Sequence, residues 1–441
     1  MVFICVVDRT ISILREKISA DRPRFFVTSN KIASLKNIPM TSNEQRWRDG
    51  GGTLLPSDRS TTSPDAAWII GAIESTVRIS MAWTRGFSVR SRSRQLPVTR
   101  WHSDSLRTLP QTIRPPSSTR DPLHEQILSI FMNGNFRRGP LSALIPHLDV
   151  FRREIAASIQ EQRAIRIVLP TLPFKSQNPL AFPRESSTID LGEWLHFAQV
   201  RDLCASIEAV YPPGLHVTLL TDGLVYAELF GTGNDEACIY RERVTEIKET
   251  MGLSENIDVI DMQWLVDCEP EFLRVQRHIR RTIARLERTN PDICERMSAL
   301  RRSMLLHIRV PEYDFDSFVH IVNNAASGLP RTIERSARNT AAGYASFLLA
   351  MRWLHITDRA FPNTIRATVH PKPAPQLPLH LVNRHSNCFP YNGVALVSRE
   401  SLAERKNVRR ATRIVRFTDA LLMPNLTEVR NENDAFVCLL A

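Results

Sequence analysis

Two short apolar runs, separated by a helix-length segment, constrain the fold of this chain more than any other feature. AIRIVLP (164–170) is rich in β-branched residues and ends at a proline, and LHVTLLT (215–221) is followed directly by an Asp-Gly step. The segment between them has apolar residues at helical spacing from Leu191 to Ile207 and stops at Pro-Pro-Gly. Strand, helix and strand of these lengths predict a βαβ unit with parallel strands and a right-handed crossover.

Further helical and strand patterns surround this unit. Apolar residues at helical spacing over 121–162 predict two helices, with Asp121 in the position of an N-cap. A strand-like run over 256–266 is followed by helical patterns over 272–311 that place arginines on the solvent-exposed face. The sequence therefore predicts an α/β fold, in which a mostly parallel sheet is flanked by helices and interrupted by a helical insertion.

The first 120 residues differ in composition from the rest of the chain. They are rich in Ser, Thr, Arg and Pro and carry a net charge of +10, whereas residues 121–441 carry +1. Such segments bury too little apolar surface to offset the entropy lost on ordering. We therefore expect a mostly disordered basic leader over 1–120, with a short ordered piece at 67–84, and one folded domain over 121–441. Because the charge lies in the leader, nucleic acid is not predicted as a partner.

Cysteine usage and hydropathy restrict the compartment. The seven cysteines are scattered and form no C-x-x-C pair, so they predict reduced thiols and no zinc or redox site. No apolar run approaches the ~20 residues that span a bilayer, and Asp8 and Arg9 interrupt the opening apolar segment. We expect a cytoplasmic protein that binds neither a metal ion nor a membrane.

The loops that follow the two predicted strands carry charged groups. In open parallel sheets, ligands bind beyond the carboxyl ends of the strands. There, Lys175 in the first loop would supply an exposed cation and Asp222 a carboxylate, with Gly223 permitting a tight or positive-φ turn. Such a pair can hold a zwitterion or a phosphate and move a proton. The alternative is an ordinary loop lysine and an ordinary Asp-Gly turn, which spacing alone does not exclude.

Several short motifs, taken together, resemble those of a known family. LPTLPFKSQNP, IDLGE at 189–193, YPPG at 211, TDG at 221 and HP at 370 occur in this order over roughly residues 125–400. They resemble the signature of the pyoverdine/dityrosine biosynthesis family, the isocyanide synthases. This resemblance implies a Rossmann-like α/β fold, with residues 121–441 as the catalytic domain.

The resemblance also implies an activity. Family enzymes convert the α-amino group of an amino acid of the Trp, Tyr or Val type into an isonitrile, and ribulose 5-phosphate donates the carbon. A fungal branch instead contributes to N-formyl-tyrosine and dityrosine. The synthase itself is expected to need no metal or nucleotide cofactor. Its expected partners are the amino acid and the sugar phosphate, and an iron, 2-oxoglutarate-dependent oxygenase is a frequent pathway neighbour.

This chemistry suggests roles for residues of the matching motifs. A ketose phosphate requires a cationic cradle, for which the candidates are Lys175, Arg366 and Lys372. Condensation and carbon-carbon cleavage require proton transfers near neutral pH, for which the candidates are Glu193, Asp222 and His370. Further candidates for substrate binding are Asn178, Gly223, Tyr391 and Asn392. Lys175 could instead form a Schiff base with the ketone, although the amino-acid substrate already supplies an amine.

One motif departs from the family pattern. After the His-Pro step, family members reach a T-P-W-H-like segment, whereas this chain has NCFPYNGVALV. Asn392 replaces the histidine of that motif and Tyr391 replaces its aromatic residue. The loss of a titratable group is consistent with a changed amino-acid substrate, a formyl product or a weakened enzyme. A catalytically inactive member that binds or regulates is the alternative from another functional class.

Overall fold

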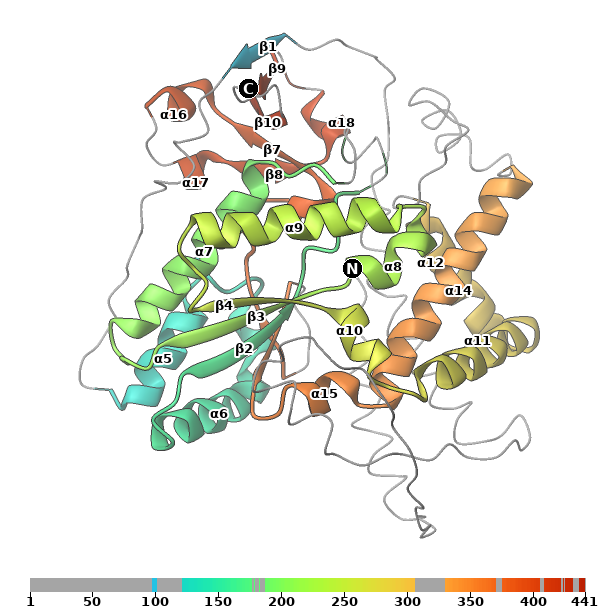
Figure 1. Ribbon diagram of the computed structural model, residues 1–441, viewed down its shortest axis with the longest axis horizontal. Coiled ribbons are helices and arrows are strands. Elements are labelled where there is room, and N and C mark those ends of the chain that lie inside the picture. Colours follow the sequence, from blue (N-terminus) through green and yellow to red (C-terminus); the bar gives the residue numbers. More distant parts are fainter. Residues whose placement is uncertain are drawn as a thin grey trace, which may run out of the picture.

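The computed structural model describes most of the chain from Asp121 onward (Figure 1). The described residues are 97–100, 121–176, 178, 182, 187–305, 330–369, 375–404, 408–421, 423, 425–430 and 436–440. The remainder of the predicted leader, including the expected ordered piece at 67–84, lies outside this set. So do His370 and Lys372, so their predicted roles stay predictions.

A five-stranded parallel sheet, ordered β4-β3-β2-β5-β6, forms the centre of the molecule. Its strands are β2 (Ile165–Pro170), β3 (Leu215–Thr221), β4 (Ile257–Asp261), β5 (Ile365–Thr368) and β6 (Leu377–Pro378). β2 and β3 run in register from Ile165 beside Leu215 to Pro170 beside Leu220. The predicted βαβ unit is therefore confirmed, and its two strands end side by side.

The helices that connect these strands cover both faces of the sheet and add the predicted helical insertion. Before β4 they are α5 (Leu123–Met132), α6 (Leu148–Gln160), α7 (Leu191–Glu208), α8 (Gly223–Phe230) and α9 (Asn234–Thr250). Between β4 and β5 lie α10 (Met262–Asp267), α11 (Phe272–Thr289), α12 (Pro291–Met304), α14 (Arg331–Trp353) and α15 (Ile356–Ala360). α7 and α9 lie on one side of the sheet and α6 and α15 on the other, while α11, α12 and α14 pack together beside it (Figure 1).

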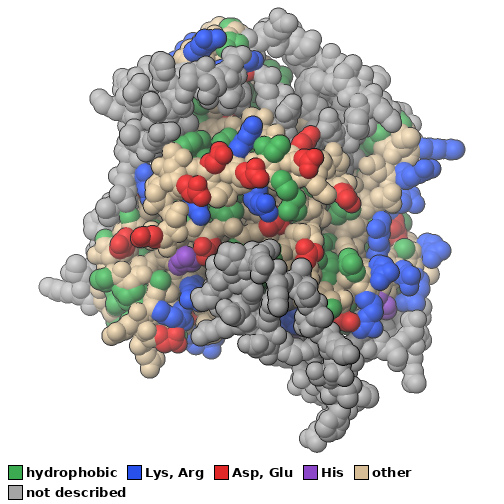
Figure 2. Space-filling view, viewed as in Figure 1, with side chains coloured by type: hydrophobic (Ala, Val, Ile, Leu, Met, Phe, Trp, Pro, Cys, Tyr) green, Lys and Arg blue, Asp and Glu red, His purple; other side chains and the backbone are tan. Residues whose placement is uncertain are grey.

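The arginines of α11 lie where the helical pattern predicts. Phe272, Val275 and Ile279 are buried on one side of this helix, whereas Arg280 and Arg281 are exposed. Figure 2 shows basic side chains gathered over this part of the molecule. The arginines thus form the solvated face of an amphipathic helix.

The strand order reverses at β2. The chain proceeds outward from β2 through β3 to β4, and then returns to place β5 on the other side of β2. The connections that leave β2 and enter β5 therefore run over opposite faces, which opens a crevice between the carboxyl ends of these two strands. In doubly wound sheets, this switch point is where ligands bind.

A second, mixed sheet, ordered β1-β9-β10-β7-β8, was not predicted from the sequence. Its strands are β1 (Val98–Arg100), β7 (Val394–Val397), β8 (Arg413–Val415), β9 (Thr427–Arg430) and β10 (Phe436–Leu440). Short helices accompany them: α16 (Arg399–Glu404), α17 (Val408–Ala411) and α18 (Phe417–Ala420). β1 pairs in parallel with β9, so three residues assigned to the leader form part of this sheet.

Helix α7 lies between the two sheets and is buried along nearly its whole length. Leu191 and Leu195 join a cluster with Val397 and Cys438 of the second sheet, whereas other residues of the helix pack on the central sheet. Even Asp202, in the middle of the helix, is buried, and it pairs with Arg409. The N-terminal end of α7 is thereby held against both sheets. No described helix is both long enough and apolar enough to cross a membrane.

Candidate active site

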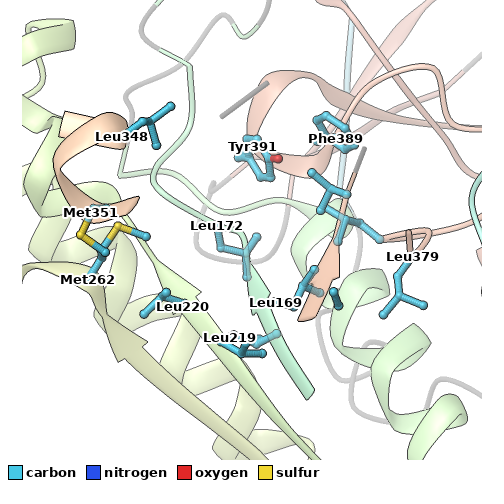
Figure 3. Packing of buried hydrophobic residues seen from close by; sticks show 14 of the residues in the cluster. Leu169, Leu172, Leu219, Leu220, Met262, Leu348, Met351, Leu379, Phe389 and Tyr391 are labelled. Atoms are coloured by element: carbon cyan, nitrogen blue, oxygen red, sulfur yellow. The ribbon is translucent and has the colours of Figure 1, made fainter. Parts of the chain in front are cut away.

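The loop that follows β2 runs along the switch point in a strained conformation. Leu172 is fully buried and has a φ of 54°, in the left-handed region that a branched apolar residue rarely adopts. The Ser176 amide donates to the Tyr391 carbonyl at 2.8 Å, which ties the loop to a 3-10 turn, η4 (Pro390–Asn392). Leu172 lies between the side chains of β3 and α14 and the ring of Tyr391 (Figure 3). The loop after β2 and η4 thus face each other across the carboxyl edge.

Lys175 is buried and already carries partners for its charge. Its ammonium lies 2.8 Å from the Glu193 carboxylate and 3.2 Å from that of Asp190, and it donates to the Pro390 carbonyl at 2.6 Å. The ring of Phe182 packs against it, 4.7 Å from Nζ to the ring centroid. The expectation that Lys175 is an exposed loop lysine is therefore wrong. A buried ammonium requires compensating charge, and the two carboxylates supply it. Its role in substrate binding stays a prediction.

The DLGE motif caps helix α7 and closes this ion cluster. Asp190 accepts from the Gly192 amide at 2.7 Å, and Glu193 accepts from the Asp190 amide at 2.9 Å, which completes a capping box. The Tyr240 hydroxyl donates to the other Glu193 oxygen at 2.9 Å. Burial, and then the neighbouring Glu193 charge, raise the pKa of Asp190 to about 7, although Lys175 opposes the shift. The DLGE motif therefore determines where helix α7 begins and supplies the carboxylates that pair with Lys175.

Asp222 is a buried carboxylate without a hydrogen-bond partner among the described residues. It follows β3 directly, its side chain is fully buried, and neither oxygen accepts a hydrogen bond from the described part of the chain. Burial, with a smaller contribution from Asp261, raises the pKa of Asp222 to about 7. A buried carboxylate without a hydrogen-bond partner lowers the stability of the folded protein. The presence of such a group at Asp222 therefore points to a function.

Gly223 allows the loop after β2 to approach the start of helix α8. A Cβ atom on this residue would lie 2.0 Å from the Pro173 carbonyl oxygen, so no other residue fits without moving the backbone. Gly223 is the first residue of helix α8 and its φ is not positive, so the positive-φ turn that the Asp-Gly step allowed is not found. This close approach brings Asp222 beside the loop that carries Lys175, but no ion pair joins the two side chains within the described residues.

A small cavity of about 30 Å³ lies between this loop, helix α8 and η4. Its lining residues are Pro173, Phe174, Ser176, Tyr226, Phe230, Tyr391 and Asn392. The hydroxyl of Tyr226 and the side-chain nitrogen of Asn392 are buried and have no partner in the described part of the molecule. Tyr226 is one helical turn beyond Asp222, whose charge helps to raise the tyrosine pKa, after burial and Tyr344. Two polar groups without a partner in the described residues therefore meet in this cavity, within a wall of aromatic rings.

Arg366 lies on β5 beside Val168 of β2, at the switch point itself but apart from Lys175. Its guanidinium lies 2.8 Å from the Asp358 carboxylate and lines a second cavity of about 150 Å³, under α14 and α15. The floor of that cavity is apolar and includes Val168, Leu220 and Met351. Lys175, in contrast, packs on the start of α7, which covers the opposite face of the sheet. The structure thus places two of the phosphate-binding candidates, Arg366 and Lys175, at different positions, and a role of either in phosphate binding stays a prediction.

Asn178 and His196 complete the surroundings of the ion cluster. Asn178 is buried in the loop after β2, where its backbone N–H donates a hydrogen bond to Ser176 Oγ at 3.3 Å. His196 lies one turn beyond Glu193 on α7, and its Nδ1 is 3.0 Å from the Leu381 carbonyl. Burial lowers the pKa of His196 to about 4, so the ring is neutral. Its Nε2 has no partner in the described residues.

Sequence reasoning missed four of these groups, of which Asp190 belongs to the DLGE motif itself. His196 and Tyr226 stand at helical spacing from Glu193 and Asp222, and that spacing was the available signal for both. Tyr240 comes from α9 and had no local signal. No group of three or more His, Cys, Asp or Glu side chains in the described residues is arranged to hold a metal ion.

Comparisons with known proteins agree with this architecture. The family model described as pyoverdine/dityrosine biosynthesis protein matches residues 155–414. An L-tyrosine isonitrile synthase of Pseudomonas aeruginosa is 25% identical over 245 residues, which cover 55% of this chain and 72% of that protein. An L-tryptophan isonitrile synthase of Fischerella ambigua is 20% identical over 236 residues, covering 52% and 64% respectively. The crystal structure of the PvcA protein from Pseudomonas aeruginosa superposes with a TM-score of 0.55 at 20% identity, over 72% of this chain and 99% of that chain.

Proposed function

The chain belongs to the pyoverdine/dityrosine biosynthesis protein family, and from this membership we propose that it converts the α-amino group of an amino acid into an isonitrile. Ribulose 5-phosphate is the proposed carbon donor. The proposed reaction condenses the amine with the ketone and then cleaves carbon-carbon bonds, and it uses no metal or nucleotide cofactor. The product would pass to an iron, 2-oxoglutarate-dependent oxygenase.

The observation that carries this proposal is the Asp222 carboxylate, which is buried at the carboxyl edge of the sheet and has no hydrogen-bond partner among the described residues. An α-amino group must lose a proton before it can attack a ketone, and later steps return protons to the substrate. A carboxyl group with a pKa of about 7 can accept and donate protons at neutral pH. Asp222 is therefore the proposed general base and acid.

Tyr226 and Asn392 are the proposed hydrogen-bond donors to the substrate. Both line the small cavity, and the Tyr226 hydroxyl and the Asn392 amide nitrogen are buried without a partner in the described residues. Such donors stabilise negative charge that develops on an oxygen during condensation. The ion cluster of Lys175, Glu193 and Asp190 is the proposed support, because Lys175 binds the carbonyl of Pro390 at the start of η4.

The aromatic lining favours an aromatic substrate. Phe174, Phe230, Tyr226 and Tyr391 contribute rings to the cavity wall, and aromatic rings pack preferentially against one another. We therefore rank L-tyrosine and L-tryptophan ahead of L-valine. The names of the relatives, which are L-tyrosine and L-tryptophan isonitrile synthases, support the same order.

A formamide product is the second candidate, and Asn392 is the observation that favours it. The family pattern that this segment resembles has a histidine at the position of Asn392, and an asparagine side chain cannot transfer a proton. An isonitrile differs from the corresponding formamide by one molecule of water, so the loss of one acid could change which of the two is released.

One experiment separates these outcomes. The full chain is incubated with ribulose 5-phosphate labelled with ¹³C at the ketone carbon and with L-tyrosine, L-tryptophan or L-valine, and the products are identified by mass spectrometry. A labelled isonitrile supports the proposal, and a product heavier by one water supports the formamide alternative. Binding of both substrates without a labelled product would instead indicate an inactive family member.

A further inference from the structure

A group of five basic side chains lies beside the candidate active site and outside all the motifs discussed above. We call Arg137, Arg138, His380, Arg384 and His385 the basic cluster. Its Arg137 and Arg138 lie in the segment that follows helix α5, and its other three residues lie in the segment that follows strand β6. The Arg138 amide donates to the Pro378 carbonyl at 2.9 Å, and the His380 amide donates to the Phe136 carbonyl at 2.7 Å. The two segments therefore pair along the last strand of the central sheet.

Arg138 connects the basic cluster to the switch point. Its guanidinium donates to the carbonyl of Val369, the residue directly after β5, at 3.2 Å, and lies 4.5 Å from the ring centroid of Phe389. Phe389 stacks on Tyr391, with centroids 5.4 Å apart and ring planes 22° apart (Figure 3). Tyr391 lines the cavity that holds Tyr226 and Asn392. Arg138 is therefore linked to the wall of this cavity through the rings of Phe389 and Tyr391.

Two arginines of the basic cluster, Arg137 and Arg384, have no acidic partner in the described part of the chain. Arg137 donates to the carbonyls of Met132 and Gly139, and Arg384 contacts the ring of His385. Lys175 and Arg366, by comparison, both have carboxylate partners.

The ionisation of His380 reflects the same excess of positive charge. Burial, followed by the positive charges of Arg138, Arg137, His385 and Arg384, lowers the pKa of His380 to about 4. A site that carries several arginines and keeps His380 neutral is suited to an anion that brings its own negative charge.

We infer that the basic cluster binds the phosphate group of the sugar-phosphate substrate. This inference rests on the proposed function, and it moves phosphate recognition from Lys175 to Arg138 and its neighbours. The planar guanidinium of Arg138 suits two phosphate oxygens at once. Bound in this way, the phosphate would lie on the Phe389 side of η4, and the ketone carbon would point toward the cavity that Tyr226 and Asn392 line.

Direct binding measurements test the inference independently of turnover. Ribulose 5-phosphate, ribulose and inorganic phosphate are titrated by calorimetry into the full chain and into Arg384→Ala, Arg138→Lys and Arg274→Ala. Arg384 is exposed, so its removal leaves the fold intact even where the Arg138 variant does not fold. Arg274 is the control, because it is exposed on α11 and pairs with Glu271.

We expect ribulose 5-phosphate to bind at least about tenfold more tightly than ribulose, and Arg384→Ala and Arg138→Lys to remove about tenfold of that affinity. Ribulose binding should not change, and Arg274→Ala should match the wild type. The inference is overturned if both cluster variants keep wild-type affinity for ribulose 5-phosphate, if ribulose binding falls equally, or if inorganic phosphate alone binds as tightly as the sugar phosphate. It is also overturned if the wild type does not bind ribulose 5-phosphate.

The same measurements distinguish failure of the inference from failure of the proposed function. A wild type that forms no labelled product, but whose affinity for ribulose 5-phosphate depends on Arg384, refutes the proposed function and supports the basic cluster. The opposite result refutes the basic cluster alone: the wild type forms product, and Arg384→Ala and Arg138→Lys leave the KM for ribulose 5-phosphate unchanged.

Discussion

The ammonium of Lys175 lies 2.8 Å from the carboxylate of Glu193, and neither side chain is exposed to solvent. This pair joins the loop after β2 to the first turn of α7, and the bond from Lys175 to the Pro390 carbonyl adds η4. Three segments that are distant in the sequence therefore depend on one buried cation. The PFK and DLGE motifs have a shared structural explanation in this contact.

Replacing Lys175 with methionine should destabilise the protein strongly. The change leaves the carboxylates of Glu193 and Asp190 buried without their cation, which typically costs about 3–5 kcal/mol. Equilibrium denaturation measures the loss. Lys248→Met on α9 is the matched control, since Lys248 is only half-buried and makes no ion pair in the described residues. A loss below about 1 kcal/mol for Lys175→Met would contradict a supporting role for the ion cluster.

Asp222→Asn should retain substrate binding and lose turnover. The amide has the shape of the carboxyl group but cannot accept a proton, and general acid–base groups contribute about 10²–10⁴-fold to rate. The kcat of the wild type should rise with pH through about 7, the pKa of Asp222, and the residual activity of the variant should lack that step. An unchanged kcat, or a retained step near pH 7, would exclude Asp222 as the base.

The same variant should change how stability depends on pH. The pKa of Asp222 is raised to about 7 in the folded protein, above its usual 3.8, so the folded state holds this proton more tightly than the unfolded chain. The wild type should therefore lose stability, relative to Asp222→Asn, as pH rises from about 4 to about 7. At 1.36 kcal/mol per pKa unit, the difference reaches a few kcal/mol. Parallel stability curves for the two proteins over this range would show that the carboxyl group is not perturbed.

Tyr226→Phe should reduce kcat without reducing stability. The ring would keep its packing against Tyr344 and Phe347, at centroid distances of 4.8 and 5.0 Å, and only a hydroxyl without a partner in the described residues is removed. We expect about a tenfold or larger loss of kcat. Tyr211→Phe is the opposite control, because Tyr211 donates to the carbonyls of Ser158 and Arg163. It should cost about 1 kcal/mol of stability and leave kcat unchanged.

Gly223→Ala should disturb the site through the backbone. The added methyl group would meet the Pro173 carbonyl at 2.0 Å, so α8 or the loop after β2 must move. We expect a loss of about 2 kcal/mol or more, of the size seen for overpacking, together with reduced turnover. Gly134→Ala should be nearly neutral, because nothing lies within 4 Å of its Cβ position. Equal melting temperatures for the two variants would refute the close approach.

The central sheet could be predicted because its signals are local. The segments that form β2 and β3 are short, contain β-branched residues and end at Pro or at an Asp-Gly step. The helix between them has apolar residues at helical spacing along its whole length. The second sheet lacks such signals. Its strands are three to five residues long, and β1 is exposed and pairs with a strand from the far end of the chain. Pairing of this kind is decided by tertiary contact, which local patterns do not encode.

From the sequence, we could predict only those residues of the candidate site that belong to a local motif. The Asp-Gly step after a strand identified Asp222 and Gly223. The exposure of Lys175 was predicted wrongly because its partners come from a helix cap and a distant turn. Tyr226 resembles an ordinary core residue, and its helical spacing from Asp222 was the one local signal for it. Arg138 stands in a segment without any motif, so only the folded structure shows that it lies near the site.

The pairing of β1 with β9 has a consequence for how the protein is made. Val98 lies beside Glu428, so this sheet cannot be completed until nearly the whole described chain has been synthesised, and the ordering of so long a loop slows folding. The central sheet needs only residues up to β6 and can form earlier. Until β7 arrives, the apolar side of α7 that contains Leu191 and Leu195 would face water. We therefore expect the nascent chain to depend on chaperones during this interval, and the active site to be enclosed in the last step of folding.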